Sequence, residues 1–413
     1  MKVSSGLVRP FGYEEALDSP AGWRVVGGAH AVTAVTFGSA YAFSALFPAL
    51  ATEFNASRGE TSLIFSMAAV TYYWLGALAG PLADRFPTRA IVLVGMIALI
   101  LGHIGASFAG SLPFLYASYG LGVGVGIGLS YVPAIGAVQS WFLVKRSRAS
   151  GVATAGLGIG TLILPLCVGQ LLPFLGWRLC LIAIACVIGL VGLPAALVLR
   201  KRGEGGGSAS ASGDRPGGGP SPLTAWQTPQ FIRYYLAMAL ASVPTFVAYV
   251  HIVPSARDLG VPLEAATVLI GIIGIGNIFG RFVLAGLGDR FGRIRLLAAL
   301  TLAVAGSFVI WATATGFSQL AIFAVVFGMS YGGTVGLYPA VATDLFGSRH
   351  IGSMIGYLYT SVGFAALVGP SLAGFTFDFT GSYRAPIVIC IVISVVAAGL
   401  AAQLQSPQPD VSG

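Results

Sequence analysis

Charged side chains are scarce in this chain. Only 9% of its 413 residues are Asp, Glu, Lys or Arg, whereas 56% are hydrophobic. Soluble domains carry about 25% charged residues, so this composition excludes a soluble globular protein. The sequence therefore predicts an all-α protein that spans a lipid bilayer many times.

Motifs for catalysis and for metal or nucleotide binding are also missing. The four cysteines lie within apolar runs, lack metal-ligand spacing and are interpreted as small packing residues; they are Cys167, Cys180, Cys186 and Cys390. No phosphate-binding loop is present, because the glycine repeats of 119–128 lie inside an apolar run. Residues 1–21 contain no apolar block, so we expect no cleavable signal peptide. We expect no metal, no cofactor and no enzymatic activity, and any transport must be secondary.

Twelve apolar runs follow one another along the chain, and each is long enough to cross a hydrocarbon core of roughly 30 Å. They cover approximately residues 22–50, 61–83, 90–110, 113–140, 150–173, 177–199, 230–256, 263–287, 295–315, 318–345, 351–376 and 384–404. The segment between the sixth and seventh runs is rich in Gly, Ser and Pro, which is typical of a flexible linker. The predicted domains are a six-helix bundle over 1–200, a linker over 201–229 and a second bundle over 230–413.

The basic residues predict the orientation. With the N-terminus inside, 17 of the 22 Lys and Arg residues fall in cytoplasmic segments, four fall outside and Arg281 falls within the membrane. The positive-inside rule then places both termini and the linker in the cytoplasm of a multi-pass protein of the inner (plasma) membrane. The net charge of +8 reflects this topology and gives no reason to expect nucleic acid as a partner.

One cation, Arg281, lies deep in an apolar run. It precedes the charged end at Asp289 by eight residues, or about 12 Å of helix. A buried arginine costs at least roughly 2.5–3.5 kcal/mol of insertion free energy and is tolerated where it has something to bind. No Asp or Glu lies at comparable depth, which favours an anionic substrate over a structural ion pair. Asn277 lies one turn away on the same face.

The two halves of the chain repeat. GPLADRFPTR after the second run matches AGLGDRFGRIR after the eighth, with Asp84 and Asp289 separated by 205 residues. These segments resemble the loop signature of the major facilitator superfamily. The resemblance implies two pseudo-symmetric six-helix bundles, and it implies that Asp84, Arg85, Asp289 and Arg290 are gating residues. Topogenic charges are the alternative interpretation of these loops.

A second resemblance is narrower. The segment WFLVKRSRASGVATAGLGIG resembles a signature of the monocarboxylate transporter branch. A second signature of that branch is half present at the start of the first run, which keeps its glycine and tryptophan as Gly22 and Trp23 but lacks its acidic residue. The resemblance implies that Arg281 corresponds to the arginine with which this branch binds its substrate. The branch's proton-carrying Asp is replaced by Asn277, which cannot titrate, and its lysine in the first helix is absent.

Four further residues are candidates for the site. Tyr119 and Tyr331 lie near the middle of their runs, where each hydroxyl needs a partner such as a carboxylate. His251 and Asp258 share the seventh run, seven residues apart, and are candidates for proton coupling. Packing is the alternative role of His251.

One deep arginine balances one negative charge, which favours a small monocarboxylate of the lactate or pyruvate type. We therefore expect a proton-coupled symporter of such an acid. An organic-anion exchanger of the oxalate/formate type is the alternative, and a non-transporting sensor or an exporter of larger compounds is the third possibility.

Overall fold

The computed structural model describes residues 16–202, 226–347 and 351–405, and helices are the regular secondary structure of these ranges. Eleven helical runs in them are long and apolar enough to cross a membrane. One of these, Arg148–Val198, is 51 residues long. It is broken at Gly176, whose φ of 70° reverses the chain direction, so it supplies two crossings. The twelve predicted crossings are therefore all present.

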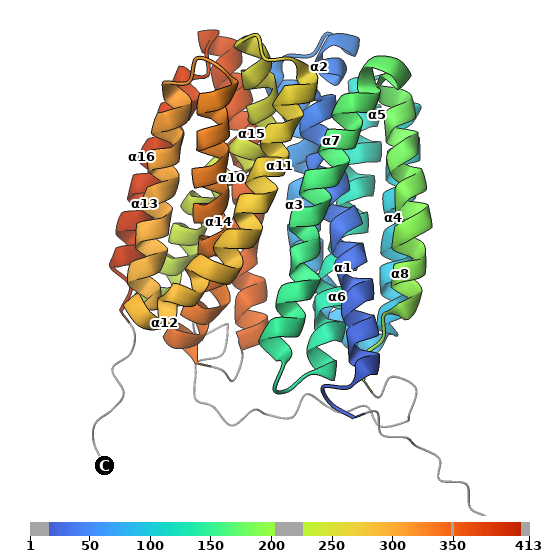
Figure 1. The fold of residues 1–413 in the computed structure, drawn as a ribbon, viewed down its shortest axis with the longest axis vertical. Helices are drawn as coiled ribbons and strands as arrows, with labels where there is room; N and C mark the ends of the chain where they lie inside the picture. The colour runs from blue at the N-terminus through green and yellow to red at the C-terminus, as the bar shows by residue number, and fades with distance from the viewer. Residues whose placement is uncertain (1–15, 203–225, 348–350, 406–413) are drawn as a thin grey trace, which may run out of the picture.

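The first half of the chain forms one bundle, in blue to green in Figure 1. Its crossings are built from α1 (Pro20–Tyr41) with α2 (Phe43–Glu53), α3 (Arg58–Arg85), α4 (Thr88–Ser107), α5 (Leu112–Leu115) with the π-helical η1 (Tyr116–Val123) and α6 (Gly124–Trp141), and α7 (Arg146–Val187) with η2 (Ile188–Gly192) and α8 (Leu193–Val198).

The second half forms the other bundle, in yellow to red in Figure 1. It contains α10 (Pro229–Asp258), α11 (Leu263–Phe279) with η3 (Gly280–Leu284), η4 (Ala285–Leu287) and α12 (Gly288–Phe291), then α13 (Arg293–Ala312), α14 (Phe317–Phe346), α15 (Ile351–Thr380) and α16 (Arg384–Ala402). The predicted linker lies mostly in 203–225, outside the described residues.

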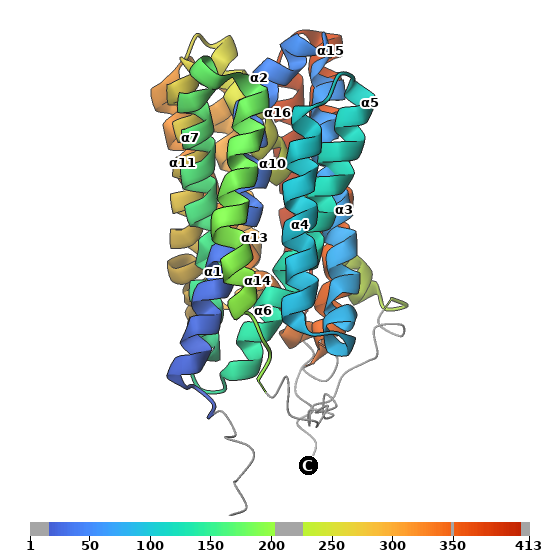
Figure 2. The same cartoon turned by 90° about the vertical axis from the view of Figure 1, so that its right-hand side faces the viewer.

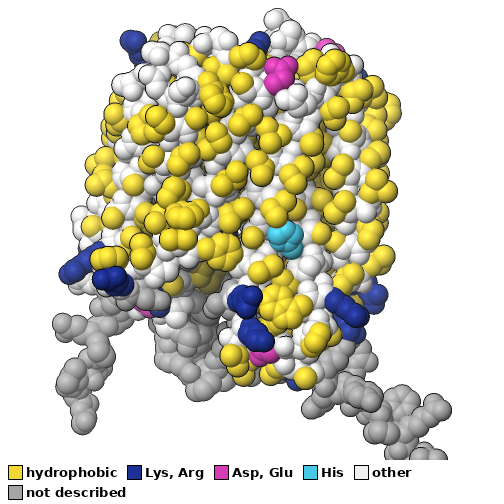
Figure 3. All heavy atoms as spheres, viewed as in Figure 1, with side chains coloured by type: hydrophobic (Ala, Val, Ile, Leu, Met, Phe, Trp, Pro, Cys, Tyr) yellow, Lys and Arg dark blue, Asp and Glu magenta, His cyan; other side chains and the backbone are white. Residues whose placement is uncertain are grey.

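The helix α1 begins and α16 ends at the same end of the molecule, called here the basic end (lower in Figures 1 and 2). Figure 3 shows Lys and Arg side chains gathered near this end, below a broad band of hydrophobic side chains. Such a band, with large side chains such as Leu101, Leu190 and Phe174 exposed, matches the surface that hydrocarbon would solvate. The charges therefore mark the ends of the spans.

The bundles meet mainly along two helix pairs, α3 with α15 and α7 with α11, and α2 also packs on α10. The whole contact surface between the bundles is called the seam. Small residues allow the second pair to approach closely. A Cβ on Gly158 would lie 3.0 Å from the carbonyl oxygen of Gly274, and a Cβ on Gly274 would lie 3.0 Å from that of Gly158. Close backbone approach at small residues is how helices pack where hydrocarbon is the solvent. Any central site between the bundles is bounded by these two helix pairs.

Candidate functional site

Arg281 lies on the π-helical turn η3, where α11 packs closely on α14. A side chain at Gly280 would collide with the backbone of Met329, so glycine is needed for this contact. Arg281 is half-buried, and its Nε donates to Asn277 Oδ1 at 2.9 Å. No carboxylate of the described residues is recorded within ion-pair distance of Arg281. The guanidinium is therefore oriented by a neutral amide and keeps its charge available.

Four tyrosines, from both bundles, lie close enough to Arg281 to be influenced by its charge. Its charge acts on the hydroxyl groups of tyrosines from α1, α10, α14 and α15, which are Tyr41, Tyr249, Tyr331 and Tyr359. The ring of Tyr249 stacks on that of Tyr41 across the seam, with centroids 4.0 Å apart. Tyr331 meets Tyr249 edge to face at 6.2 Å. Tyr331 and Asn277, two predicted site residues, thus lie beside Arg281.

The other predicted tyrosine, Tyr119, lies within the first bundle. Its hydroxyl donates to the carbonyl oxygen of Ser39 at 3.3 Å, and its ring packs on Phe43 and His103. This tyrosine is fully buried among residues of α1 and α4. In this conformation its hydroxyl already has a protein acceptor, so the structure does not bring it together with Arg281.

His251 is buried at the seam, on the side away from the basic end. Its Nε2 lies 2.9 Å from the carbonyl oxygen of Pro370 and 3.2 Å from Ser62 Oγ, and its Nδ1 lies 3.0 Å from the Tyr383 hydroxyl. A carbonyl can only accept, so the network assigns the proton to Nε2 and makes Nδ1 the acceptor from Tyr383. His251 therefore links α10 to helices of both bundles.

Asp258, the second coupling candidate, pairs with Arg58 at the end opposite the basic end. Arg58 Nη2 lies 2.6 Å from Asp258 Oδ1, so this ion pair joins α3 of one bundle to α10 of the other. The Arg58 guanidinium also lies 3.8 Å from the centre of the Phe377 ring and 5.0 Å from that of Tyr383. His251, Tyr383, Arg58 and Asp258 therefore form one connected polar group.

Asp378, on α15, caps the first turn of α3 from the other bundle. Its Oδ1 accepts from the Arg58 amide at 2.9 Å and its Oδ2 accepts from the Gly59 amide at 2.8 Å. The first amides of a helix have no partner within the helix, and a carboxylate there is stabilised by hydrogen bonds and by the helix dipole. We call these contacts of Arg58 and Gly59 with Asp258 and Asp378 the outer seal.

Sequence analysis did not find Arg58 or Asp378. A signal was present for Arg58, because it is one of only four basic residues assigned to the outer segments. The partner of its amide could not be predicted, since Asp378 lies 320 residues away in a segment with no motif. The capping box of Ser57 and Glu60 did mark the start of this helix.

The predicted gating residues lie at the basic end. The side chains of Asp84 and Asp289 lie outside the described residues. Arg85 is exposed at the last position of α3, and the Arg290 guanidinium lies 5.5 Å from the centre of the Phe291 ring. An ion pair between Arg293 and Asp344, 2.8 Å apart, ties α13 to α14 within the second bundle.

A carboxylate that sequence analysis did not single out lies before α1. Asp18 precedes the first residue of this helix by two positions. Its carboxylate accepts from the amides of Leu143, Val144 and Lys145, at 3.4, 3.2 and 2.9 Å. The hydrogen bond from the amide of Lys145, together with those from Val144 and Leu143, lowers the pKa of Asp18, although desolvation of the carboxylate opposes this shift. The two signature segments are thus bound to each other, a long-range contact that spacing along the chain does not reveal.

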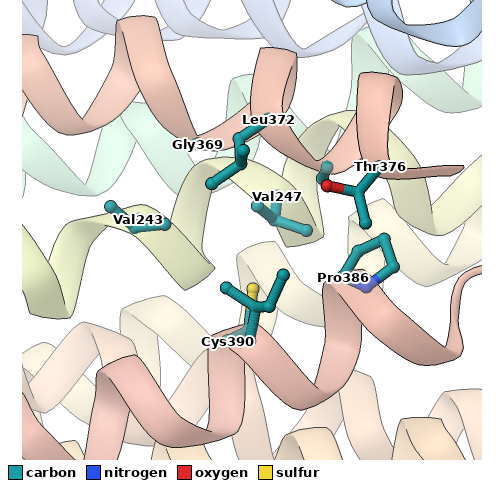
Figure 4. A pocket seen from close by; sticks show the side chains of 9 residues that line it. Val243, Val247, Gly369, Leu372, Thr376, Pro386 and Cys390 are labelled. Atoms are coloured by element: carbon teal, nitrogen blue, oxygen red, sulfur yellow. The ribbon is translucent and has the colours of Figure 1, made fainter. Parts of the chain in front are cut away.

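A separate apolar pocket lies between α10, α15 and α16 (Figure 4). Nine residues line it, among them Val243, Leu372, Thr376 and Cys390. None of its lining residues is charged, so it cannot balance an anion. Arg281 and its tyrosines remain the only described set of residues in which a deep cation faces other polar groups.

Twelve crossings in two bundles, with a cation held between them, define a polytopic membrane carrier of the six-plus-six type. The model of the Major Facilitator Superfamily matches residues 29–353 and 256–412. The chain belongs to this superfamily and, within it, to the monocarboxylate transporter family.

Relatives in that family match over most of both chains. Human monocarboxylate transporter 11 is 30% identical over 90% of this chain and 80% of its own length. Rat monocarboxylate transporter 13 is 28% identical over 94% and 89%, and mouse monocarboxylate transporter 4 is 29% identical over 90% and 80%.

Solved structures agree on the fold. The inward-facing, occupied form of a bacterial homologue of the human lysosomal transporter Spinster superposes with a TM-score of 0.74 at 16% identity, covering 93% of this chain and 96% of that one. Its unoccupied form gives a TM-score of 0.71 at 17% identity, covering 94% and 97%. The predicted fold class and family are confirmed.

The outer seal predicts a conformational effect of Asp378. In Asp378→Ala the first amides of α3 lose an acceptor that only the other bundle supplies, so separation of the bundles at this end should become easier. Loss of a helix cap costs about 0.5–2 kcal/mol, which corresponds to about a 2- to 30-fold rise in the open population. Distances between spin labels at Ala56 and Ser382 would report it.

Glu60→Ala is the matched control. It weakens the same helix start, but Glu60 bonds to the amide of Ser57 within its own bundle. We expect it to leave the label distances unchanged. Equal distance distributions in Asp378→Ala and the parent protein would show that the carboxylate does not hold the bundles together.

Proposed function

We propose that the protein is a secondary transporter that moves a small monocarboxylate, of the lactate or pyruvate type, across the membrane together with a proton. The observation that carries the proposal is Arg281, a cation between the bundles that is oriented by Asn277 and lacks a carboxylate partner among the described residues. One positive charge in a site of low dielectric balances one carboxylate. The monocarboxylate transporters among its relatives support the same substrate class.

The mechanism we propose is alternating access. Substrate binds near Arg281 while one end of the seam is closed, and the bundles rock to expose it to the other side. The outer seal would close one end, and the loops that carry Asp84, Arg85, Asp289 and Arg290 would close the basic end. The relatives do not favour an organic-anion exchanger, the alternative considered above.

The proposed orientation places the basic end, both termini and the linker in the cytoplasm of a cell with an inner membrane. The 17-to-4 division of basic residues supports it. In a variant without cysteines, single cysteines at Ser208 and Gly381 should react with an impermeant reagent from opposite sides of the membrane. Reaction of both from the same side would contradict the topology.

Carboxylate binding at Arg281 predicts that the guanidinium itself is required. A guanidinium can offer two parallel N–H donors to a carboxylate, whereas an ammonium is a point charge. Arg281→Lys should therefore reduce uptake of labelled lactate into proteoliposomes by at least 100-fold although the charge is kept.

Arg257→Lys provides the control for this variant. Arg257 lies at the far end of α10, where its guanidinium donates to the carbonyl oxygen of Val261. We expect uptake close to that of the parent protein. Near-normal lactate affinity in Arg281→Lys would make Arg281 a structural residue and would refute the proposed site.

Proton coupling is proposed through His251 and Asp258, since Asn277 cannot titrate. A monoanion entering a negative-inside cell is opposed by about 2.3 kcal/mol per 100 mV, so accumulation needs a compensating proton. His251→Ala and Asp258→Asn should reduce accumulation driven by an inward pH gradient by about tenfold and change substrate binding less.

Two assays distinguish the outcomes for coupling. If both variants keep full gradient-driven accumulation, the proton travels with the substrate and not on these side chains. Counterflow tests exchange directly, because an exchanger needs substrate on both sides whereas a symporter needs only the pH gradient. Uptake that requires internal substrate would replace the symport proposal with the exchanger.

A further inference from the structure

Two buried polar atoms beside Arg281 have no hydrogen-bond partner. They are Asn277 Nδ2 and the hydroxyl oxygen of Tyr249. Both residues are almost completely buried, and only 1% of the surface of each residue is exposed. Buried polar groups in proteins are nearly always paired, so each such atom needs an explanation. A ligand that enters the site between the bundles is one explanation. The positions of the two atoms indicate which part of such a ligand they would contact.

The free atom of Asn277 is a donor. The side-chain oxygen of an amide is often assigned from its contacts, and here Arg281 Nε donates to it at 2.9 Å. Arg281 has no acceptor to offer, so the amide cannot be turned around. The NH₂ group therefore lies on the side of the amide that does not face Arg281 Nε, and it has two hydrogens to donate.

Tyr249 reaches the same region from the other direction. Along the chain, α10 runs away from the basic end, whereas α11 runs towards it (Figure 1). Side chains lean towards the N-terminus of their helix, so Tyr249 leans towards the basic end while Asn277 and Arg281 lean away from it. These opposite directions bring the three side chains towards one another, and the charge of Arg281 acts on the Tyr249 hydroxyl.

The ring of Tyr249 is held in place by its neighbours. Tyr41 stacks on it at 4.0 Å and Tyr331 meets it edge to face at 6.2 Å. A ring fixed in this way cannot turn its hydroxyl to water at low cost. The hydroxyl is thus a preorganised donor and acceptor beside the guanidinium, which is the arrangement expected of a group that recognises a ligand.

We propose that Tyr249 is a specificity-determining residue that recognises the oxygen on C2 of the substrate. This inference rests on the proposed function, in which Arg281 binds the carboxylate. A 2-oxo oxygen accepts from both Asn277 Nδ2 and the Tyr249 hydroxyl. A 2-hydroxyl accepts from the amide and donates to the tyrosine oxygen. An acid without this oxygen leaves both protein groups unpaired in a buried site. Its affinity is therefore lower.

The test compares L-lactate with propionate, which have the same carbon chain and differ by the C2 hydroxyl. Tyr249→Phe removes only the phenolic oxygen and keeps the ring that stacks on Tyr41. We expect lactate affinity to fall by about five- to tenfold, the effect of one neutral hydrogen bond, while propionate affinity stays within about twofold. Affinities are measured by competition against labelled substrate in proteoliposomes.

Tyr234→Phe is the matched control on the same helix. It also removes a buried hydroxyl, which donates to the carbonyl oxygen of Tyr338 at 2.8 Å within the second bundle. We expect the lactate-to-propionate ratio to remain that of the parent protein. Retained propionate uptake in Tyr249→Phe shows that this variant folds.

Each result decides a different question. A ratio that is unchanged in Tyr249→Phe, or a parent protein that does not discriminate between the two acids, refutes the role of Tyr249 and leaves the proposed function standing. Equal losses for both acids would also refute this role, because the hydroxyl would then bind a water or contribute to packing and would not recognise the C2 oxygen. A parent protein that binds neither acid refutes the proposed function itself.

Discussion

The guanidinium of Arg281, half-buried between two bundles, is the constraint on which the rest of the site depends. A cation in a region solvated by hydrocarbon is tolerated only where protein or ligand groups replace water. Asn277 supplies one acceptor, and rigid tyrosines from four helices supply polar groups around it without supplying a second charge. The site is therefore polar but not neutralised. That imbalance is the physical reason for the anionic ligand proposed above.

The residues that surround this cation also join the bundles. Tyr41 and Tyr249 stack across the seam, and His251 contacts Ser62 in one bundle and Tyr383 in the other. Ligand binding and closure of the seam therefore draw on the same side chains. A carbonyl oxygen and a phenol already contact the two ring nitrogens of His251, so protonation at Nδ1 would require the Tyr383 hydroxyl to change from donor to acceptor. Under the proposed coupling, proton uptake therefore rearranges the hydrogen bonds of a residue that contacts both bundles.

The fold could be predicted from the sequence because it depends on local properties. Apolar runs about 20 residues long define spans, Gly176 between Phe174 and Trp177 separates two of them, and repeated loops reveal the two halves. The proximity of Asn277 to Arg281 also follows from helical spacing. The outer seal and the tyrosines around Arg281 could not be predicted, since Asp378 and Tyr249 meet their partners only through packing of distant helices. Asp18 was missed for a related reason: its role depends on a loop 125 residues later.

The two kinds of contact in this structure differ in strength, and the proposed cycle explains the difference. Within each bundle, large rings such as Trp141, Phe308 and Phe323 are completely buried, and burying a large apolar side chain contributes about 1.5–3 kcal/mol. The outer seal instead uses a partly exposed ion pair of Arg58 and helix-capping bonds to an exposed carboxylate. An exposed ion pair contributes about 0–1 kcal/mol, and it exchanges its partners for water with little loss. The rings that hold each bundle together are apolar and buried, whereas the contacts of the outer seal, which must break when this end opens, are polar and reachable by water. Two bundles with apolar cores, joined at one end by a polar seal, are therefore the physical basis of the alternating access proposed above.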